Sequence, residues 1–290
     1  MHYSGGMGTQ PNSPAPEILT PGNDDVPSPA PRPRSRWAEA PATYLLVGIN
    51  CGVFLAMVAR GVSAFSPTVD QLMHWGADNA GHVLILGQWW RIVTAMFVHV
   101  GIIHLATNMW CLWNLGLLAE PLMGSAGLVS AYILTGAAGN LLSTFVNWWW
   151  WNQDWVKYHD PGLFPAGAGA SGAVFGIAGA LIVLLKSKRL PVPRDELKRL
   201  RRSVIYFAGI NLIIGFSISL GTDLIGGGLH IDNWAHMGGF ACGLAFAAPM
   251  VPRIGSPRNV FSTRMRLAVA AIVALLVLFG FYLAQLPPQG

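Results

Sequence analysis

The chain has 290 residues, of which 53% are hydrophobic and only 11% are charged, and its mean hydropathy is +0.46. Because about a quarter of the residues in a typical soluble domain are charged, this composition excludes an ordinary soluble protein and indicates a polytopic membrane protein. The three cysteines lie in apolar stretches without paired spacing, which argues against a disulfide framework or a thiolate metal site; they are Cys51, Cys111 and Cys242.

The first 40 residues differ in composition from the rest of the chain. Residues 1–40 are rich in proline, glycine and small polar residues and contain few large apolar ones. Such a segment buries too little apolar surface to offset the entropy of ordering it, so we expect a disordered cytoplasmic tail. It has neither the apolar stretch of a signal peptide nor the Arg/Ser pattern of an organelle presequence, which favours a bacterial plasma membrane.

Seven apolar windows of about 20 residues follow, each long enough to cross roughly 30 Å of hydrocarbon as a helix. They cover residues 43–62, 97–118, 125–147, 167–186, 203–221, 230–250 and 266–286. Residues 63–96 are too broken to span, and Trp90 and Arg91 in this segment suit an anchor among the lipid headgroups. The predicted fold is therefore an all-α membrane protein.

Basic residues predict the orientation of these spans. With the amino terminus inside, 15 of the 18 Lys and Arg residues are cytoplasmic and the carboxy terminus is outside. The net charge of +5 then reflects topology, and the basic run at 186–202 indicates attraction to anionic lipid; we expect no nucleic-acid partner.

The topology places four polar residues at similar depth near the outer face. The second, fourth and sixth spans all run from outside to inside, and polar residues lie near their starts: His104, Asn108, Ser171 and His236. Ser171 lies about a turn into its span, His104 a turn or two, and His236 nearly two turns. Ionisable residues within spans are costly, and they usually face a cavity or a partner.

Structural roles are the alternative for these residues. Glycines flank Ser171, and Gly172 with Gly176 forms a small-xxx-small pair of the kind that packs helices tightly. A buried histidine is also often neutral and hydrogen-bonded to a neighbouring helix. Asp232, four residues before His236, suits helix capping better than orientation of the imidazole.

The combination of a serine with a histidine on another span favours nucleophilic catalysis. A neutral imidazole of His236 would accept the Ser171 hydroxyl proton, and Gly239-xxx-Gly243 would let its helix pack against Gly169 and Gly172. His104 and Asn108 share a helix face and offer donors to an oxyanion together with the Ser171 backbone N–H. The sequence lacks HExxH and a facing pair of aspartates, so zinc and aspartyl chemistries fit worse.

Four motifs in this order closely resemble the rhomboid intramembrane serine proteases. They are Gln88-Trp89-Trp90-Arg91, His104-Leu105-Ala106-Thr107-Asn108, Gly169-Ala170-Ser171-Gly172 and Ala235-His236-Met237-Gly238-Gly239. The resemblance covers residues about 43–250 and implies a six-helix catalytic domain at 41–252. The basic loop and added seventh helix at 253–290 are similar to the "six plus one" rhomboid layout.

The resemblance also implies roles for individual residues. The dyad falls on Ser171 and His236, the oxyanion groups on His104, Asn108 and the Ser171 N–H, and an aromatic residue beneath the histidine on Phe175. It implies substrates that are transmembrane proteins of the lipid bilayer, with no metal and no cofactor. The alternatives are a non-catalytic rhomboid-like protein that binds transmembrane helices for quality control, and a transporter, for which the halves show no convincing repeat.

Overall fold

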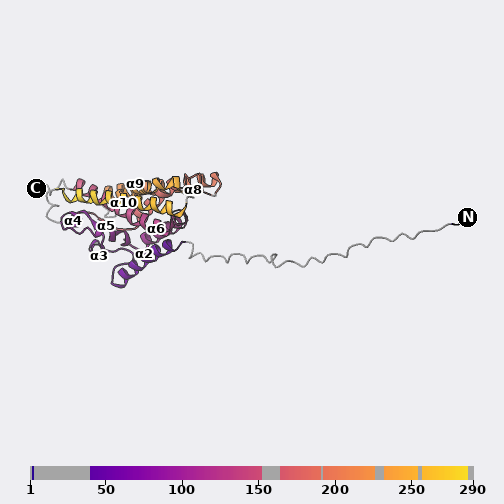
Figure 1. Ribbon diagram of the computed structural model, residues 1–290. Helices are drawn as coiled ribbons and strands as arrows, with labels where there is room; N and C mark the ends of the chain where they lie inside the picture. The colour runs from indigo at the N-terminus through magenta and orange to yellow at the C-terminus, as the bar shows by residue number, and fades with distance from the viewer. Residues whose placement is uncertain are drawn as a thin grey trace. The chain divides into compact units, whose positions relative to one another are not determined.

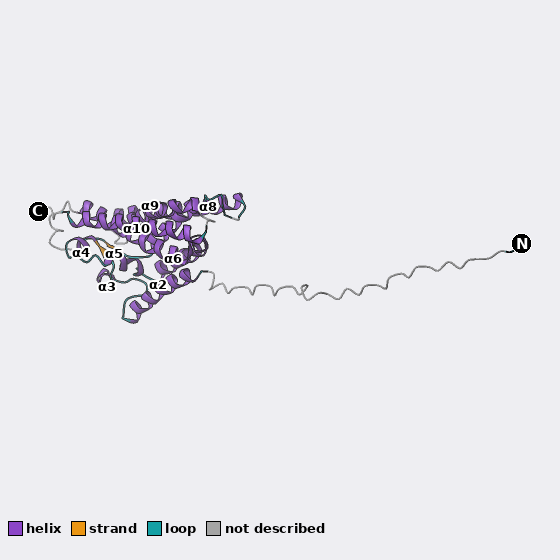
Figure 2. Cartoon of the chain, in the orientation of Figure 1, coloured by secondary structure: helices purple, strands orange, loops and turns teal. Residues whose placement is uncertain are grey.

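A computed structural model of the chain describes residues 2, 40–151, 164–190, 192–225, 232–253 and 257–286. The predicted disordered tail lies outside the described residues, except for residues 2 and 40. Residues 157 and 159, in the loop after the third span, also lie outside them. Within them the chain is an all-α membrane protein whose helices, with two very short strands, form the body shown in Figures 1 and 2.

The elements follow one another along the chain in this order: α2 (Pro41–Ala59), α3 (Val69–His74), β1 (Asp78–Asn79), α4 (Ala80–Leu84), α5 (Arg91–Thr94), η2 (Ala95–Phe97), α6 (Ile102–Trp151), β2 (Ala166–Gly167), α7 (Ser171–Leu184), α8 (Arg194–Ile225), α9 (Asn233–Ala247), η5 (Ala248–Arg253) and α10 (Arg258–Ala284). Among the described residues, stretches 41–59, 102–150, 233–251 and 259–284 are long and apolar enough to cross a membrane. Helix α7 is apolar but shorter, and the predicted span 203–221 lies within α8.

The second and third predicted spans join in one long element. Helix α6 covers both of them, and Gly124 inside it has φ 76° and ψ 163°, which breaks the helical path just after Pro121. A positive φ is readily adopted by glycine and rarely by other residues, so this glycine allows the chain to turn without a loop. Instead of the expected gap at 119–124, a kink separates the two spans.

A buried carboxylate from another helix caps the start of the first helix. Pro41 stands at the first turn of α2, and Ala40 at its N-cap offers no side-chain acceptor. The Glu120 carboxylate of α6 takes that place, accepting the N–H groups of Ala42 at 2.9 Å and Thr43 at 2.8 Å and the Thr43 hydroxyl at 2.7 Å. Glu120 is 2% exposed and also accepts the Ser125 hydroxyl at 2.6 Å, so its charge is fully hydrogen-bonded.

Helix α7 lies at the centre of the core. Most of its side chains are buried, and it packs against both α6 and α9. Helix α10 lies against α6 and α9, and in Figure 1 the short helices α3, α4 and α5 gather at the end of the body where α10 finishes. Strands β1 and β2 pair antiparallel, with Asp78 opposite Gly167. This pairing joins the segment after the first span to the segment that leads into α7.

Candidate functional site

Three of the predicted site residues lie at the starts of three helices that pack together. Ser171 is the first residue of α7, while His104 and His236 lie in the first turns of α6 and α9. The sequence predicted each of them deeper in its span, because apolar windows opened at 97, 167 and 230. The helices begin later, at 102, 171 and 233, because hydropathy does not register the turns that precede them.

A glycine turn fixes the start of α7. Gly169 has φ +129°, a value that helical residues do not adopt, and its N–H donates to the carbonyl of Ala95 at 2.9 Å. A Cβ built at Gly169 would lie 2.6 Å from Cε1 of His104. This one glycine therefore ends the extended segment before Ser171 and admits the His104 ring beside it.

Helices α7 and α9 touch through their backbones. A Cβ added at Gly239 would overlap the carbonyl oxygen of Gly172, and one added at Gly243 would overlap that of Gly176. Two glycines four residues apart thus form a flat strip on α9 that receives carbonyl groups of α7. The close approach brings the His236 turn of α9 against the Ser171 turn of α7.

The His236 ring is stacked on Phe175. The ring centroids lie 4.4 Å apart and the planes differ by 11°. Phe175 lies four residues after Ser171, hence one turn further along the same face of α7. His236 is 7% exposed, and its buried Nδ1 has no hydrogen-bond partner among the described residues. Stacking therefore fixes the plane of the imidazole one helical turn from the serine.

The orientation of His104 leaves one ring nitrogen as a donor. Its Nδ1 accepts the backbone N–H of Val100 at 3.4 Å, which assigns the proton to Nε2. Nε2 is also the nearer of the two nitrogens to Gly169, at 3.0 Å from a Cβ built there against 3.7 Å for Nδ1. The N–H of the ring thus faces the segment that leads into Ser171.

Asn108 lies one turn behind His104. Its side chain is 6% exposed, and its Nδ2 donates to the His104 carbonyl at 3.0 Å. One of the two amide hydrogens is therefore used within α6, which leaves the other to any group in front of the helix. Of the predicted set, the structure places His104 and His236 on the helices that pack beside Ser171. Asn108 lies one helical turn further along α6 than His104.

Trp90 and Arg91 lie in the segment before α6 and order it. The Arg91 guanidinium donates from Nη1 to the carbonyls of Met73 and Ala77, both at 2.8 Å, and from Nε to Gln88 at 2.6 Å. Its Cζ lies 4.5 Å from the ring centroid of Trp90, which is 51% exposed. Because Ala77 precedes β1, Arg91 is linked to the serine segment through the β1–β2 pair.

Asp232 has the capping role that the sequence favoured. Its Oδ1 accepts the N–H of Ala235 at 2.9 Å, which begins α9. Asp78 lies in the broken segment 63–96; it is buried at 3% exposure and, like Asp232, lies beside Gly167. No local signal marks it, because its surroundings come from elements distant in the chain.

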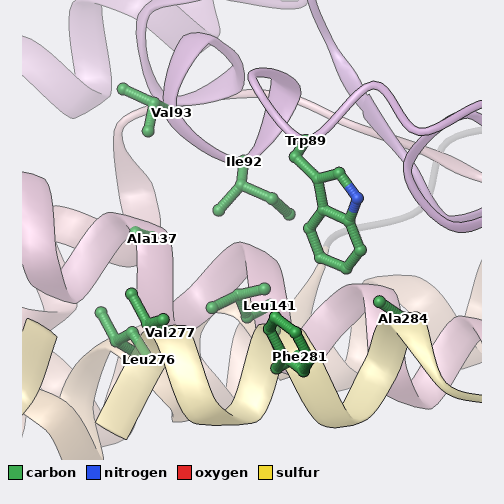
Figure 3. Close-up of a pocket in the computed structure, with 10 residues that line it drawn as sticks. Trp89, Ile92, Val93, Ala137, Leu141, Leu276, Val277, Phe281 and Ala284 are labelled. Atoms are coloured by element: carbon green, nitrogen blue, oxygen red, sulfur yellow. The ribbon is translucent and has the colours of Figure 1, made fainter. Parts of the chain in front are cut away.

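An apolar cavity of about 420 Å³ lies between the α5 segment, α6 and α10. In Figure 3 Trp89, Leu141 and Phe281 extend from these three parts of the chain toward it. Its lining residues carry no ionisable side chain and include none of the predicted site residues. Among the described residues no three His, Cys, Asp or Glu side chains come together as a metal site would require.

Comparison with known proteins adds a family and several relatives. The family model described as "Rhomboid domain" matches residues 86–253. Rhomboid protease GluP of Bacillus subtilis is 32% identical over 241 residues, which are 83% of this chain and 40% of that protein. Rhomboid protease AarA of Providencia stuartii is 27% identical over 243 residues, 82% of this chain and 83% of that protein. RHOMBOID-like protein 9, chloroplastic, of Arabidopsis thaliana is 26% identical over 205 residues, 71% of this chain and 41% of that protein.

Proposed function

Since the chain belongs to the rhomboid family, we propose that it is an intramembrane serine protease that hydrolyses peptide bonds in or near transmembrane segments of membrane proteins. The observation that carries the proposal is the stacking of His236 on Phe175, one turn from Ser171, across the close contact of α7 with α9. Two of the relatives are named as rhomboid proteases, which supports the same activity.

In the proposed reaction Ser171 is the nucleophile and His236 is the base. His236 accepts the hydroxyl proton as Ser171 Oγ attacks the substrate carbonyl carbon, and then gives that proton to the leaving amine. Water attacks the resulting ester, again with proton transfer through His236, and restores the serine. Phe175 supports this role because a ring held flat beneath the imidazole limits its rotation.

The negative oxygen of the tetrahedral intermediate needs donors. The Ser171 N–H stands in the first turn of α7, where backbone N–H groups have no partner within the helix. The Nε2–H of His104 and the second amide hydrogen of Asn108 would add to it. Gly169 and Gly172 contribute by leaving room for the His104 ring and for the approach of α9.

The proposal also covers the substrates of the protein and its orientation in the membrane. The chain is a multi-pass membrane protein, and we infer that its substrates reach Ser171 from the surrounding bilayer. The charge distribution of the sequence supports a cytoplasmic amino terminus and a site near the outer face of the membrane, which we propose is a bacterial plasma membrane. In this scheme the residues of the chain carry every step, without a metal or cofactor.

The experiment is cleavage of a single-span test protein by the purified chain in liposomes, together with labelling by a fluorophosphonate probe. Wild type is expected to cut and to label, and Ser171→Ala and His236→Ala to do neither. Ser130→Ala, which alters a half-buried serine of α6, is the matched control and is expected to behave as wild type.

Labelling separates two kinds of negative result. If wild type labels at Ser171 but does not cut, the serine is a reactive nucleophile and another test substrate is required. A wild type that neither labels nor cuts, where a known rhomboid protease does both, contradicts the proposal. The non-catalytic protein that binds transmembrane helices would then account better for the fold.

A further inference from the structure

Two carboxyl groups from distant parts of the chain meet beside the segment that leads into Ser171. Asp78 lies in β1 and Asp232 caps α9, and both lie against Gly167 of β2. A Cβ built at Gly167 would lie 3.2 Å from Oδ2 of Asp232 and 3.8 Å from Cβ of Asp78. Asp78 and Asp232 therefore both flank the backbone four residues before the serine, and their charges act on each other.

Neighbouring hydroxyl groups of α6 hold the two side chains. Ser143 Oγ donates to Oδ2 of Asp232 at 2.5 Å, and Thr144 Oγ1 donates to Oδ2 of Asp78 at 3.1 Å. The other oxygen of Asp232 accepts Ala235 N–H, whereas the other oxygen of Asp78 is buried and has no partner among the described residues. Four segments thus meet at this cluster: β1, β2, α6 and the start of α9.

Among the described residues, the charges around Asp78 do not balance. Asp232 of α9 is a like charge, and Arg91 of α5 is the cation that acts on Asp78, but its guanidinium is already engaged by the carbonyls of Met73 and Ala77. From α4 the titratable group is His82, whose Nδ1 lies 3.1 Å from Oδ1 of Asn79; α6 presents the neutral Thr144. Burial, followed by the charge of Asp232, raises the pKa of Asp78 from 3.8 to about 7.

We propose that Asp78 and Asp232 are an interacting carboxyl pair in which Asp78 holds the one proton, and that this pair positions the serine segment against the start of α9. The inference rests on the proposed function, because its consequence is the placing of His236 relative to Ser171. With Asp78 neutral, the pair stabilises the β1–β2 contact at Gly167 and the α9 cap together. When Asp78 ionises, two like charges meet at Gly167 and drive these elements apart.

Asp232 acts in this arrangement through the helix and not through the imidazole. Both of its carboxylate oxygens have donors, Ala235 N–H and the Ser143 hydroxyl, and its backbone carbonyl accepts the His236 N–H at 3.3 Å. It is therefore a positioning residue. The proton on the pair is distinct from the proton that His236 moves during the reaction.

The test is the pH dependence of cleavage and of fluorophosphonate labelling in liposomes from pH 5 to pH 9. His236 must be neutral to act as a base, so its titration shapes the acid limb. The pair shapes the alkaline limb, and for wild type we expect a fall of about tenfold between pH 6 and pH 8, as one ionisation with a midpoint near 7 gives. Asp78→Asn is expected to remove this fall and keep the rate seen at pH 6.

Three further variants make the assignment specific. Thr144→Val removes a donor that favours the ionised form of Asp78, so it is expected to move the alkaline midpoint to higher pH, which a purely structural loss would not do. Asp232→Asn keeps a capping side chain but removes the like charge, so it is expected to flatten the alkaline fall as Asp78→Asn does. The control is Asp70→Asn, an exposed acid in the first turn of α3, which is expected to follow wild type.

Two results overturn the inference in distinguishable ways. An active wild type whose alkaline limb is the same in Asp78→Asn and Thr144→Val refutes the pair and leaves the protease intact. A wild type that neither labels nor cuts at any pH refutes the proposed function and the role of the pair with it. Thr144→Val keeps the test decisive if Asp78→Asn does not fold.

Discussion

Replacing Gly239 by alanine tests whether the backbone contact of α7 with α9 brings the serine and histidine together. Gly239 lies three residues after His236, and a methyl group there would overlap the Gly172 carbonyl oxygen of α7. Since this oxygen belongs to a helix backbone, it cannot turn aside as a flexible side chain would. The helices must separate, and the His236 ring must leave its place beside Ser171.

The magnitude follows from the size of the overlap. Ordinary contacts of a Cβ begin at 3.4 Å, so the axes must part by about 1.4 Å to accept the methyl group. A displacement of about 1 Å in a catalytic pair costs about 100-fold in rate. Overpacking destabilises a core by about 1–3 kcal/mol, of which the better helix propensity of alanine offsets up to about 1 kcal/mol. We therefore expect a folded protein whose kcat is about 100-fold lower.

The assay is cleavage in liposomes at saturating substrate, with the melting temperature measured on the same preparation. Gly48→Ala in α2 is the matched control, because no atom lies within 4 Å of the Cβ it would add; its kcat is expected to equal that of wild type. Wild-type kcat in Gly239→Ala, or a loss no larger than the loss of folded protein, would refute the reasoning about this contact.

Three other predictions follow from single contacts. Glu120→Ala leaves the N–H groups of Ala42 and Thr43 without their acceptor and should lower the unfolding free energy by about 3 kcal/mol, measured by denaturation in micelles, with kcat of the folded protein unchanged. Phe175→Leu loses a ring stack worth about 1 kcal/mol and should lower kcat about fivefold, whereas Phe175→Tyr should retain it. Asp78 has a folded pKa of about 7 against 3.8 when unfolded, so the folded chain keeps a proton that the unfolded chain loses. The unfolding free energy should fall by up to about 4 kcal/mol as pH rises from 4 to 7. Melting temperatures measured across this pH range test this, and Asp78→Asn should make them nearly independent of pH.

The spans and the family are largely properties of the sequence itself. A membrane helix is recognised by about 20 apolar residues in a row, which is a local property, and the six helices α2, α6, α7, α8, α9 and α10 overlap the predicted spans. The four motifs likewise lie in short stretches, and the family match at 86–253 agrees with them. The predicted boundaries at 40 and 252 stay predictions, as do the roles of the site residues.

Hydropathy alone did not give the positions of the helix starts. Ser171 and His236 stand nearer their helix starts than hydropathy predicted, because a glycine turn at 169 and a carboxylate cap at 232 set those starts. The four-residue spacing from His104 likewise did not predict that the Asn108 amide donates to a carbonyl of its own helix.

Contacts between distant segments were decided only by the fold. Gly239 meets the Gly172 carbonyl, and Asp78 and Asp232 both flank Gly167, because the packing of α6, α7 and α9 brings residues far apart in the chain into one place. Hydropathy and motifs describe each helix by itself, and they carry no information about which faces touch. The sequence alone thus determined which residues are available for the chemistry, and the packing of helix backbones determined which of them meet.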